Sequence, residues 1–558
     1  MNKFKSKNIG YLFLFISSLV LVFSNINLHY LSTYAPDYQY YKDYISYYYG
    51  DYLTTGREQG LIYFFLISFF IKIGSDHFSL YNSDQLVSNA IQLTNVSLYL
   101  LGLLGLFYLL RQKGFKTKSI LLTFTILNFF PQTMNMILTM KPEIFAFASL
   151  PWSILLIMLF FEKNNYKYLY FSILPNTLLL TSKASIVAPV LLIYFYIIFK
   201  EKFNIFNKKF ISFFIIFVLF LTPIIIENFD ANGKHIYQHT YEVQWTPEVA
   251  DPDFLYTINF QELLFDPYRH THANSLIGMI VLDTFGDYYQ WYAYHDHSAF
   301  MYMKRNFDSI SYITHWRQFF SMILTISLYL FIFYFYFKDK KNKIFYLFPF
   351  FGIFVLLLQA YGIPQKGFDK ETAELFKTHY YAFLLVICLA FVIINLINRD
   401  TKFGYSILGV FIFTTSFLYG LPNDKPGYIE FINEKNQHID TCYINAFFIE
   451  GFDKSDCNNK AIDICEFDQI IYTPAYIDLY NEEQYNDRNN LSLQTLINSE
   501  GDSLTPQSKK ECLEAVNNGF VYDSPYIKDI KIPFFNLIYF VLFLISMFYL
   551  VRKKHLFH

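Results

Sequence analysis

Apolar runs of membrane-spanning length recur along the chain, and short basic clusters separate them. A helix needs about 20 mostly apolar residues to cross the hydrocarbon core of a bilayer. About twelve runs fit or approach that length. We predict spans at 8–24, 86–110, 118–131, 144–161, 168–182, 184–200, 210–226, 316–337, 343–360, 379–397, 403–420 and 533–551. The sequence therefore predicts an all-α polytopic membrane protein.

Composition supports this class and argues against others. Only 16% of the 558 residues are charged, whereas soluble domains carry about 25%. Aromatic residues reach 21%, as expected where Phe faces lipid and Tyr lies at the interfaces. The sequence has no Walker loop, no Gly-rich dinucleotide turn and no nucleophile elbow. We expect no cofactor and no nucleic-acid partner.

The basic clusters predict the orientation of the chain. Lys and Arg in short loops favour the cytoplasmic side of a membrane. This rule places six clusters in the cytoplasm, at 111–118, 162–167, 200–209, 338–343, 398–402 and 551–555. The first run has no small-residue cleavage site after it, so we expect an uncleaved anchor and two cytoplasmic termini. The longer connections at 25–86, 227–315 and 361–378 then lie outside, and the short run 61–73 within the first is expected to be an interfacial or re-entrant helix.

We divide the chain into three parts. Residues 1–420 form a membrane-embedded catalytic domain with interfacial helices in its external loops. Residues 421–532 form a small external α/β or loop-rich domain, and 533–558 are the last span with a basic tail. Four of the five cysteines (Cys442, Cys457, Cys465 and Cys512) fall in the external domain. An even set in an exported segment predicts two disulfides, with three pairings open.

Candidate catalytic residues lie in a tyrosine-rich stretch after the first span, "YAPDYQYYKDYISYYYGDYL". Most of its tyrosines are expected to form an aromatic belt. If a short helix begins at Pro36, Asp37 lies in its first turn. A carboxylate at the membrane surface can act as a general base on an acceptor hydroxyl. The plainer alternative is an ordinary helix-start charge, and Asp43 is the second candidate.

Candidate binding residues gather at the predicted outer ends of later spans. Lys141 and Glu143 begin the fourth span, where a snorkelling lysine before a helix start is the plain alternative. Lys183 interrupts the apolar stretch 178–192 and needs a partner or an anion, such as a lipid phosphate. Ionisable groups near membrane depth are functional hypotheses by default.

An external basic loop adds three further candidates, Lys366, Lys377 and His379. Positive groups on the outer side run against the positive-inside rule, so they suggest an anionic ligand. A solvated loop whose lysines pair with neighbouring acids is the alternative. In the loop 227–315, the run 275–285 is apolar enough to enter the interface. His295 and His297 flank an aspartate, but no further ligand follows at a typical spacing, so a metal site is not favoured.

The order of these features resembles the GT-C superfamily of integral-membrane glycosyltransferases, of the polyprenyl-phosphate-sugar-dependent, ArnT- or RgtA-like kind. The resemblance spans about the first 400 residues and rests on order more than on strict motifs. The stretches that carry it are "PDYQYY", "GLIYFFLISFF", "YLLRQKG", "KPEI", "LTSKASIVAP" and "KTHYYAFLL".

This resemblance implies an inverting sugar transfer at the external face. Asp37 would deprotonate the acceptor hydroxyl, which attacks the anomeric carbon of a lipid-linked sugar. Lys183, Lys377 and His379 would hold the lipid phosphate, and Lys141 and Glu143 would border the sugar pocket. The implied partners are a polyprenyl-phosphate sugar, a lipid-linked or glycan acceptor and membrane lipids. Tyr38, where the family carries a second acid, leaves metal dependence and the choice of base open.

Two alternatives remain. The stretches "PDYQYYKDY" and "REQGLIYFF" also look like those of Wzy- or EpsG-like polysaccharide polymerases, which use lipid-pyrophosphate-linked oligosaccharides. A non-catalytic lipid or glycan transporter would instead place polar groups in mid-span or in broken helices. The apolar span centres and the polar groups at one face favour an enzyme. A bacterial inner membrane is the expected location.

Overall fold

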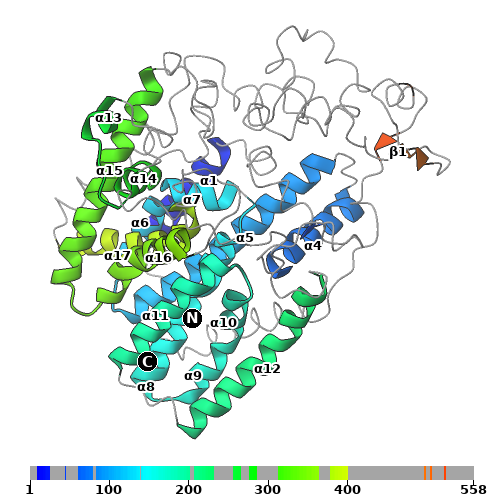
Figure 1. Ribbon diagram of the computed structural model, residues 1–558, viewed down its shortest axis with the longest axis horizontal. Coiled ribbons are helices and arrows are strands. Elements are labelled where there is room, and N and C mark those ends of the chain that lie inside the picture. The colour runs from blue at the N-terminus through cyan, green and yellow to red at the C-terminus, as the bar shows by residue number, and fades with distance from the viewer. Residues whose placement is uncertain are drawn as a thin grey trace.

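The computed structural model describes residues 9–25, 44–45, 61–78, 83–138, 140–201, 207–231, 255–265, 275–285, 312–362 and 378–399, and a few positions between 496 and 522. In these parts the protein is almost entirely helical (Figure 1). The predicted spans 403–420 and 533–551 lie outside the described residues, as do the cysteines of the predicted external domain. The fifth cysteine, Cys388, is a buried free thiol in α17.

The helices follow the predicted order, with connections that are short wherever they are described. They are α1 (Ile9–Asn25), α4 (Leu61–Phe78), α5 (Ser83–Gln112), α6 (Thr117–Leu127), α7 (Pro131–Leu138), α8 (Glu143–Lys163), α9 (Tyr166–Phe171), α10 (Ile173–Leu180), α11 (Ala184–Lys200), α12 (Lys208–Ala231), α13 (Phe260–Phe265), α14 (Leu276–Asp283), α15 (Tyr312–Lys338), α16 (Lys343–Gly362), the 3-10 helix η7 (Thr378–Tyr381) and α17 (Ala382–Arg399).

A small antiparallel sheet is described within the predicted external domain. Its strands are β1 (Leu496–Ile497), β2 (Ser503–Leu504) and β3 (Val521–Tyr522), in the spatial order β2-β1-β3. Leu496 of the central strand is opposite Leu504 on one side and Tyr522 on the other. These short strands are compatible with the α/β or loop-rich content predicted there.

Four helices are long and apolar enough to cross a bilayer: Ala90–Gln112, Glu143–Lys163, Lys208–Ile226 and Phe319–Lys338. Six further apolar helices are shorter. This supports an integral helical membrane protein, while the predicted total of twelve spans is not reached in the described residues. The predicted span 168–182 is split between α9 and α10 near Ser172, where Pro175 lacks an N–H for the helix ladder. The α6 helix has only 11 residues.

The centre of the bundle is the crossing of α5 with α8, which lie side by side. A Cβ atom at Gly102 would come within 2.5 Å of the Phe147 ring, and one at Gly105 within 2.7 Å of Trp152 Nε1. Small residues let membrane helices approach this closely. Trp152 is fully buried and donates a hydrogen bond to the Leu101 carbonyl at 3.1 Å. Helix α8 is consequently buried along most of its length.

The short run predicted as an interfacial helix is an 18-residue helix, α4, whose described side chains are mostly buried. Phe64 stacks on Tyr44, with ring centroids 4.6 Å apart. Tyr44 is fully buried, so this tyrosine of the predicted aromatic belt packs in the core. The Tyr63 hydroxyl donates to Asn95 at 2.8 Å, and Asn95 donates to the Ile137 carbonyl at 2.9 Å. These bonds tie α4 and α5 to α7, directly before the turn that carries Lys141.

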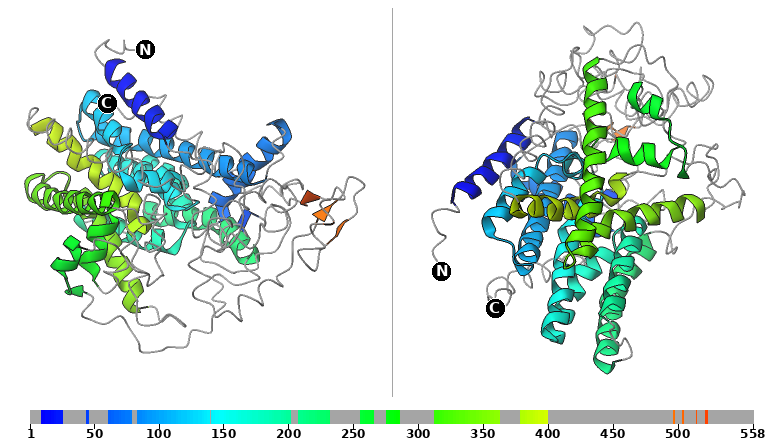
Figure 2. Two further views of the ribbon diagram at one scale, coloured as in Figure 1. Left: turned by 90° about the horizontal axis from the view of Figure 1, so that it is seen from above. Right: turned by 90° about the vertical axis from the view of Figure 1, so that its left-hand side faces the viewer.

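Charged residues of the described helices lie at two opposite ends of the bundle. Glu143 and Glu162 stand near the two ends of α8, 19 residues and hence about 28 Å apart along the helix. Lys113, Glu162, Lys200 and Asp339 interact electrostatically at one end. Four of the predicted cytoplasmic clusters therefore meet on one side, here called the basic end, and Glu143 lies at the opposite end. The bundle seen from two further sides is shown in Figure 2.

Candidate functional site

The site opposite the basic end is built around an ion pair between Lys183 and Glu143. The Lys183 ammonium lies 3.0 Å from Glu143 Oε1. The Lys183 side chain is 11% exposed and that of Glu143 is 1% exposed. Lys183 immediately precedes α11 in extended backbone, after the turn in which Thr181 and Ser182 donate to carbonyls of α10. Two helix starts, of α8 and α11, therefore meet at this pair.

The ring of Tyr380 in η7 lies next to the ion pair. The Lys183 ammonium lies 4.1 Å from the centroid of the Tyr380 ring, and the Lys141 ammonium lies 5.9 Å from it. A cation within about 6 Å of a ring centroid is attracted by the negative face of the ring. Lys141 is itself only 2% exposed. The ring thus holds two buried lysines, 42 residues apart in the sequence, near one another.

Close packing fixes η7 in this position. A Cβ atom at Gly352 of α16 would overlap the Cβ of Tyr381, so only glycine allows this approach. Gln132 of α7 donates to the Asp283 carbonyl at 2.6 Å and to the Thr378 hydroxyl at 3.4 Å. The segments 275–285 and 378–399 are thereby joined to α7 next to the site.

The site combines two ammonium groups with one carboxylate. Glu143 lies in the first turn of α8, where the helix dipole stabilises a carboxylate. Its second oxygen, Oε2, is buried and has no hydrogen-bond partner among the described residues. The cluster brings two lysines and one glutamate together at the Tyr380 ring. An ammonium group binds phosphate as a compact point charge, so these two lysines are suited to an anionic ligand.

The structure brings together three of the eight predicted site residues, Lys141, Glu143 and Lys183. The backbone of a fourth, His379, belongs to η7 and immediately precedes Tyr380. Asp37, Asp43, Lys366 and Lys377 lie outside the described residues, so their roles remain predictions. The described residues contain no group of three or more His, Cys, Asp or Glu side chains placed to hold a metal ion.

Sequence reasoning missed Tyr380, Gln132 and Thr378. Tyr380 stood inside the quoted stretch "KTHYY", where one more tyrosine gave no signal in a chain with 49 of them. Gln132 and Thr378 are both fully buried, and a buried polar residue needs partners. Their partners are 151 and 246 residues away in the sequence from Gln132, so only the fold could reveal them.

The apolar run 275–285, predicted to enter the interface, forms a buried helix. Ser275 caps α14 by accepting from the Gly278 N–H at 3.0 Å. Leu282 packs with Leu263 and Met322, which joins α14 to α13 and α15. Asp283 at the end of this helix is 1% exposed. In this region the apolar face is covered by protein, and the helix abuts the site through Gln132.

The comparisons with known proteins give one family. Residues 58–226 match the model of the family described as dolichyl-phosphate-mannose-protein mannosyltransferase. The matched segment runs from α4 to α12 and includes Lys141, Glu143 and Lys183, whereas Asp37 and Tyr380 lie outside it. The chain has no significant match among curated proteins or among solved structures. The family match supports a glycosyltransferase of the GT-C type.

Proposed function

We propose that this protein transfers a sugar from a polyprenyl-phosphate donor to a lipid-linked or other cell-surface glycan acceptor at the external face of the membrane. The observation that carries this proposal is the buried cluster of Lys141, Lys183 and Glu143 under the Tyr380 ring. The two ammonium groups of this cluster are suited to the phosphate of such a donor. The family match points to the same donor class, and its name makes mannose the first sugar to test.

In the proposed reaction, Lys183 and Lys141 hold the donor phosphate and Glu143 keeps Lys183 in place. This assignment differs from the resemblance, which puts Lys141 and Glu143 at the sugar pocket, because Lys141 and Lys183 lie at the same ring. The phosphate contacts implied for Lys377 and His379 stay predictions.

Asp37 takes the proton from the acceptor hydroxyl. The hydroxyl oxygen attacks the anomeric carbon while the bond from that carbon to the phosphate oxygen breaks. The phosphate leaves with the bonding electron pair, and the two lysines stabilise its charge. A single displacement of this kind inverts the anomeric configuration.

The second candidate function is a polysaccharide polymerase with a lipid-pyrophosphate-linked oligosaccharide as donor. It uses the same kind of anion site, but a pyrophosphate brings more negative charge than one phosphate. The family match favours the monophosphate donor, because its description names a dolichyl-phosphate sugar. Transfer assays with matched polyprenyl-phosphate and polyprenyl-pyrophosphate sugars distinguish the two.

The first experiment compares Asp37→Asn with Asp43→Asn in the full-length protein in membrane vesicles. Loss of a general base typically lowers a rate by about 10²- to 10⁴-fold. We expect Asp37→Asn to lose transfer to this extent and Asp43→Asn to retain it. The donor is polyprenyl-phosphate mannose, and transfer to endogenous lipid-linked glycan is measured. Native activity in Asp37→Asn would remove Asp37 as the base, and loss only in Asp43→Asn would assign that role to Asp43.

A further inference from the structure

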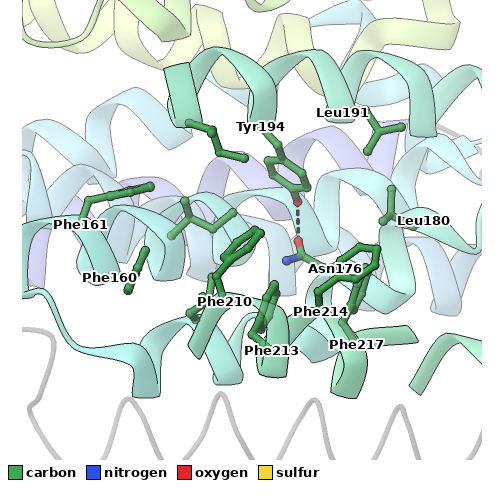
Figure 3. Close-up of a pocket in the computed structure, with 13 residues that line it drawn as sticks. Phe160, Phe161, Asn176, Leu180, Leu191, Tyr194, Phe210, Phe213, Phe214 and Phe217 are labelled. Atoms are coloured by element: carbon green, nitrogen blue, oxygen red, sulfur yellow. Dashed lines mark hydrogen bonds between the residues drawn. The ribbon is translucent and has the colours of Figure 1, made fainter. Parts of the chain in front are cut away.

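An apolar cavity of about 140 Å³ lies between α8, α10, α11 and α12 (Figure 3). Six phenylalanines dominate its wall: Phe160, Phe161, Phe210, Phe213, Phe214 and Phe217. A dry cavity of about 150 Å³ lined by apolar side chains can bind benzene. This cavity is therefore large enough to hold part of a hydrocarbon chain.

The cavity lies toward the basic end of the bundle. Phe160 is 17 residues after Glu143 on α8, which corresponds to about 26 Å along the helix. Phe210 is in the first turn of α12. Leu180, which also lines the cavity, comes three residues before Lys183, so the cavity extends from the basic end toward the Lys183 site. Its lining residues include no charged side chain.

One wall of the cavity belongs to the surface that faces lipid. Phe214 is 55% exposed and Leu191 is 38% exposed, although both are apolar. Only 17% of the spanning part of α12 is buried. Exposed apolar side chains on a spanning helix contact lipid chains. A chain of a neighbouring lipid therefore has a direct lateral way into the cavity.

The few polar groups of the inner wall form hydrogen bonds with one another. Tyr194 of α11 donates a hydrogen bond to the Asn176 carbonyl group, as the dashed line in Figure 3 shows. Ser153 of α8 donates to the same oxygen and lies 2.6 Å from the Tyr194 hydroxyl. Asn176 also donates to Ser172 at 3.2 Å. Because these groups form hydrogen bonds with one another, they do not need a polar ligand. We therefore expect a hydrocarbon chain in this part of the cavity.

Four exposed lysines, here called the lysine rim, lie within two residues of cavity-lining residues at the basic end: Lys163, Lys167, Lys208 and Lys209. They come from the end of α8 and the starts of α9 and α12. Lys209 lies 5.0 Å from the centroid of the Tyr166 ring, and Lys163 lies 5.6 Å from that of Tyr168. Basic residues between membrane helices recognise anionic lipid headgroups. The rim thus complements the charge of such a headgroup.

We propose that this cavity binds one acyl chain of an anionic glycerophospholipid whose headgroup is held by the lysine rim. By the positive-inside rule the basic end faces the cytoplasm, so the lipid comes from the cytoplasmic leaflet. The lipid fills the space between α12 and the rest of the bundle and stabilises the packing of α12 on α9 and α10, the helices with which it makes contact.

The experiment counts lipids on the purified full-length protein by native mass spectrometry, with phosphatidylglycerol and phosphatidylcholine of identical chains as probes. We expect phosphatidylglycerol to bind at least about fivefold more tightly. Substituting the four rim lysines by Gln removes this preference, whereas Lys340→Gln with Lys341→Gln on another basic turn retains it. No sugar donor is present, so the result is independent of the proposed transfer activity.

The cavity itself is tested by filling it. Leu191→Trp places a larger ring in the wall and is expected to lower phosphatidylglycerol binding at least about fivefold. Leu219→Trp, on an exposed position of α12 outside the cavity, is the matched control and retains binding. Equal binding of the two phospholipids, native binding by Leu191→Trp, or displacement of phosphatidylglycerol by an equimolar amount of polyprenyl phosphate would each overturn the proposal.

Discussion

Two carboxylates, Glu143 and Asp339, lie near opposite ends of the bundle, and each is the centre of a polar cluster. Asp339 Oδ2 accepts hydrogen bonds from Asn342, Tyr346 and Asn395 at 2.9, 3.0 and 3.1 Å. The three donors are neutral, and they come from the turn before α16, from α16 and from α17. A carboxylate with these donors joins helices and offers little to a ligand.

Glu143 is surrounded differently. It is paired with the ammonium of Lys183 and lies in a cluster with a second lysine and an aromatic ring. Its second oxygen has no partner among the described residues. The contrast teaches that a hydrogen-bonded carboxylate does not by itself identify a site, because Asp339 is partly buried and well bonded and yet has only neutral donors. The donors to Glu143 include a charged ammonium group, as expected of a cluster that binds an anionic ligand. The donors to Asp339 are neutral, as expected of a cluster that only holds helices together.

The largest effect is expected from Lys183→Met, which removes the ammonium but keeps much of the apolar stem. Loss of one preorganised group that stabilises developing charge costs about 10²- to 10³-fold in rate. We expect transfer from polyprenyl-phosphate mannose to fall at least about 100-fold. The assay is transfer in membrane vesicles at increasing donor concentration.

Lys338→Met, an exposed lysine at the basic end, is the control and keeps native transfer. The double variant Lys183→Met with Glu143→Gln removes both charges and tests whether an unpaired glutamate, rather than the missing lysine, causes the loss. If either Lys183 variant transferred within twofold of the native rate, Lys183 would not hold the donor phosphate.

The next effect concerns stability and uses Glu143→Ala. Removing one partner of a buried ion pair costs about 3–5 kcal/mol because the other charge is left uncompensated. We expect a loss of this size in the free energy of unfolding, measured in detergent micelles. In a double-mutant cycle, adding Lys183→Met should restore part of the stability. Equal, additive losses in the two single variants would mean that the pair is not coupled.

Asp339→Asn is expected to lower stability without affecting donor binding. It replaces a charged acceptor by a neutral one, and hydrogen bonds to charged groups contribute about 1.5–3 kcal/mol. We expect the free energy of unfolding to fall by about 2 kcal/mol, while the KM for the donor stays unchanged. Lys340→Gln, an exposed neighbour, is the control for loss of a charge in the same turn. A changed donor KM in Asp339→Asn would mean that the Asp339 cluster also takes part in donor binding, contrary to the proposal.

The sequence predicted the elements of this fold better than their environments. The span 184–200 coincides with α11, and 144–161 lies within α8, because long apolar runs between basic clusters leave few alternatives. The break near Ser172 and the burial of α4 were not predicted. Both depend on packing against other helices, which a single apolar run does not encode.

The same limit applies to the candidate site. Lys141, Glu143 and Lys183 were recognisable because charge beside apolar runs is rare. That Lys183 pairs with Glu143, 40 residues earlier, required the fold. Tyr380 and Gln132 were not recognisable, because neither a tyrosine nor a glutamine is unusual in its local sequence. The sequence therefore did not reveal which residues from distant segments come into contact.

The smallest effect is expected at Lys113, which shares the basic end with Asp339. Burial lowers the pKa of Lys113, and nearby Lys200 lowers it further, although Glu162 and Asp339 oppose the shift. In the unfolded chain a lysine keeps its proton up to a pH of about 10.4. Between the lowered folded pKa and that value the unfolded state binds more protons, so stability rises with pH through this window.

Lys113→Gln should therefore remove this rise, which is seen as a smaller increase in the midpoint of thermal unfolding between neutral pH and about pH 10. The exposed Lys116→Gln keeps Lys113 and should keep the rise. If Lys113→Gln showed the native pH profile, the buried lysine at the basic end would carry no burial penalty. The basic end would then differ from the Glu143 end in two respects: its charges would be open to solvent, and the groups that donate to its carboxylate are neutral. The assignment of the binding site would then rest on the Lys183 cluster alone.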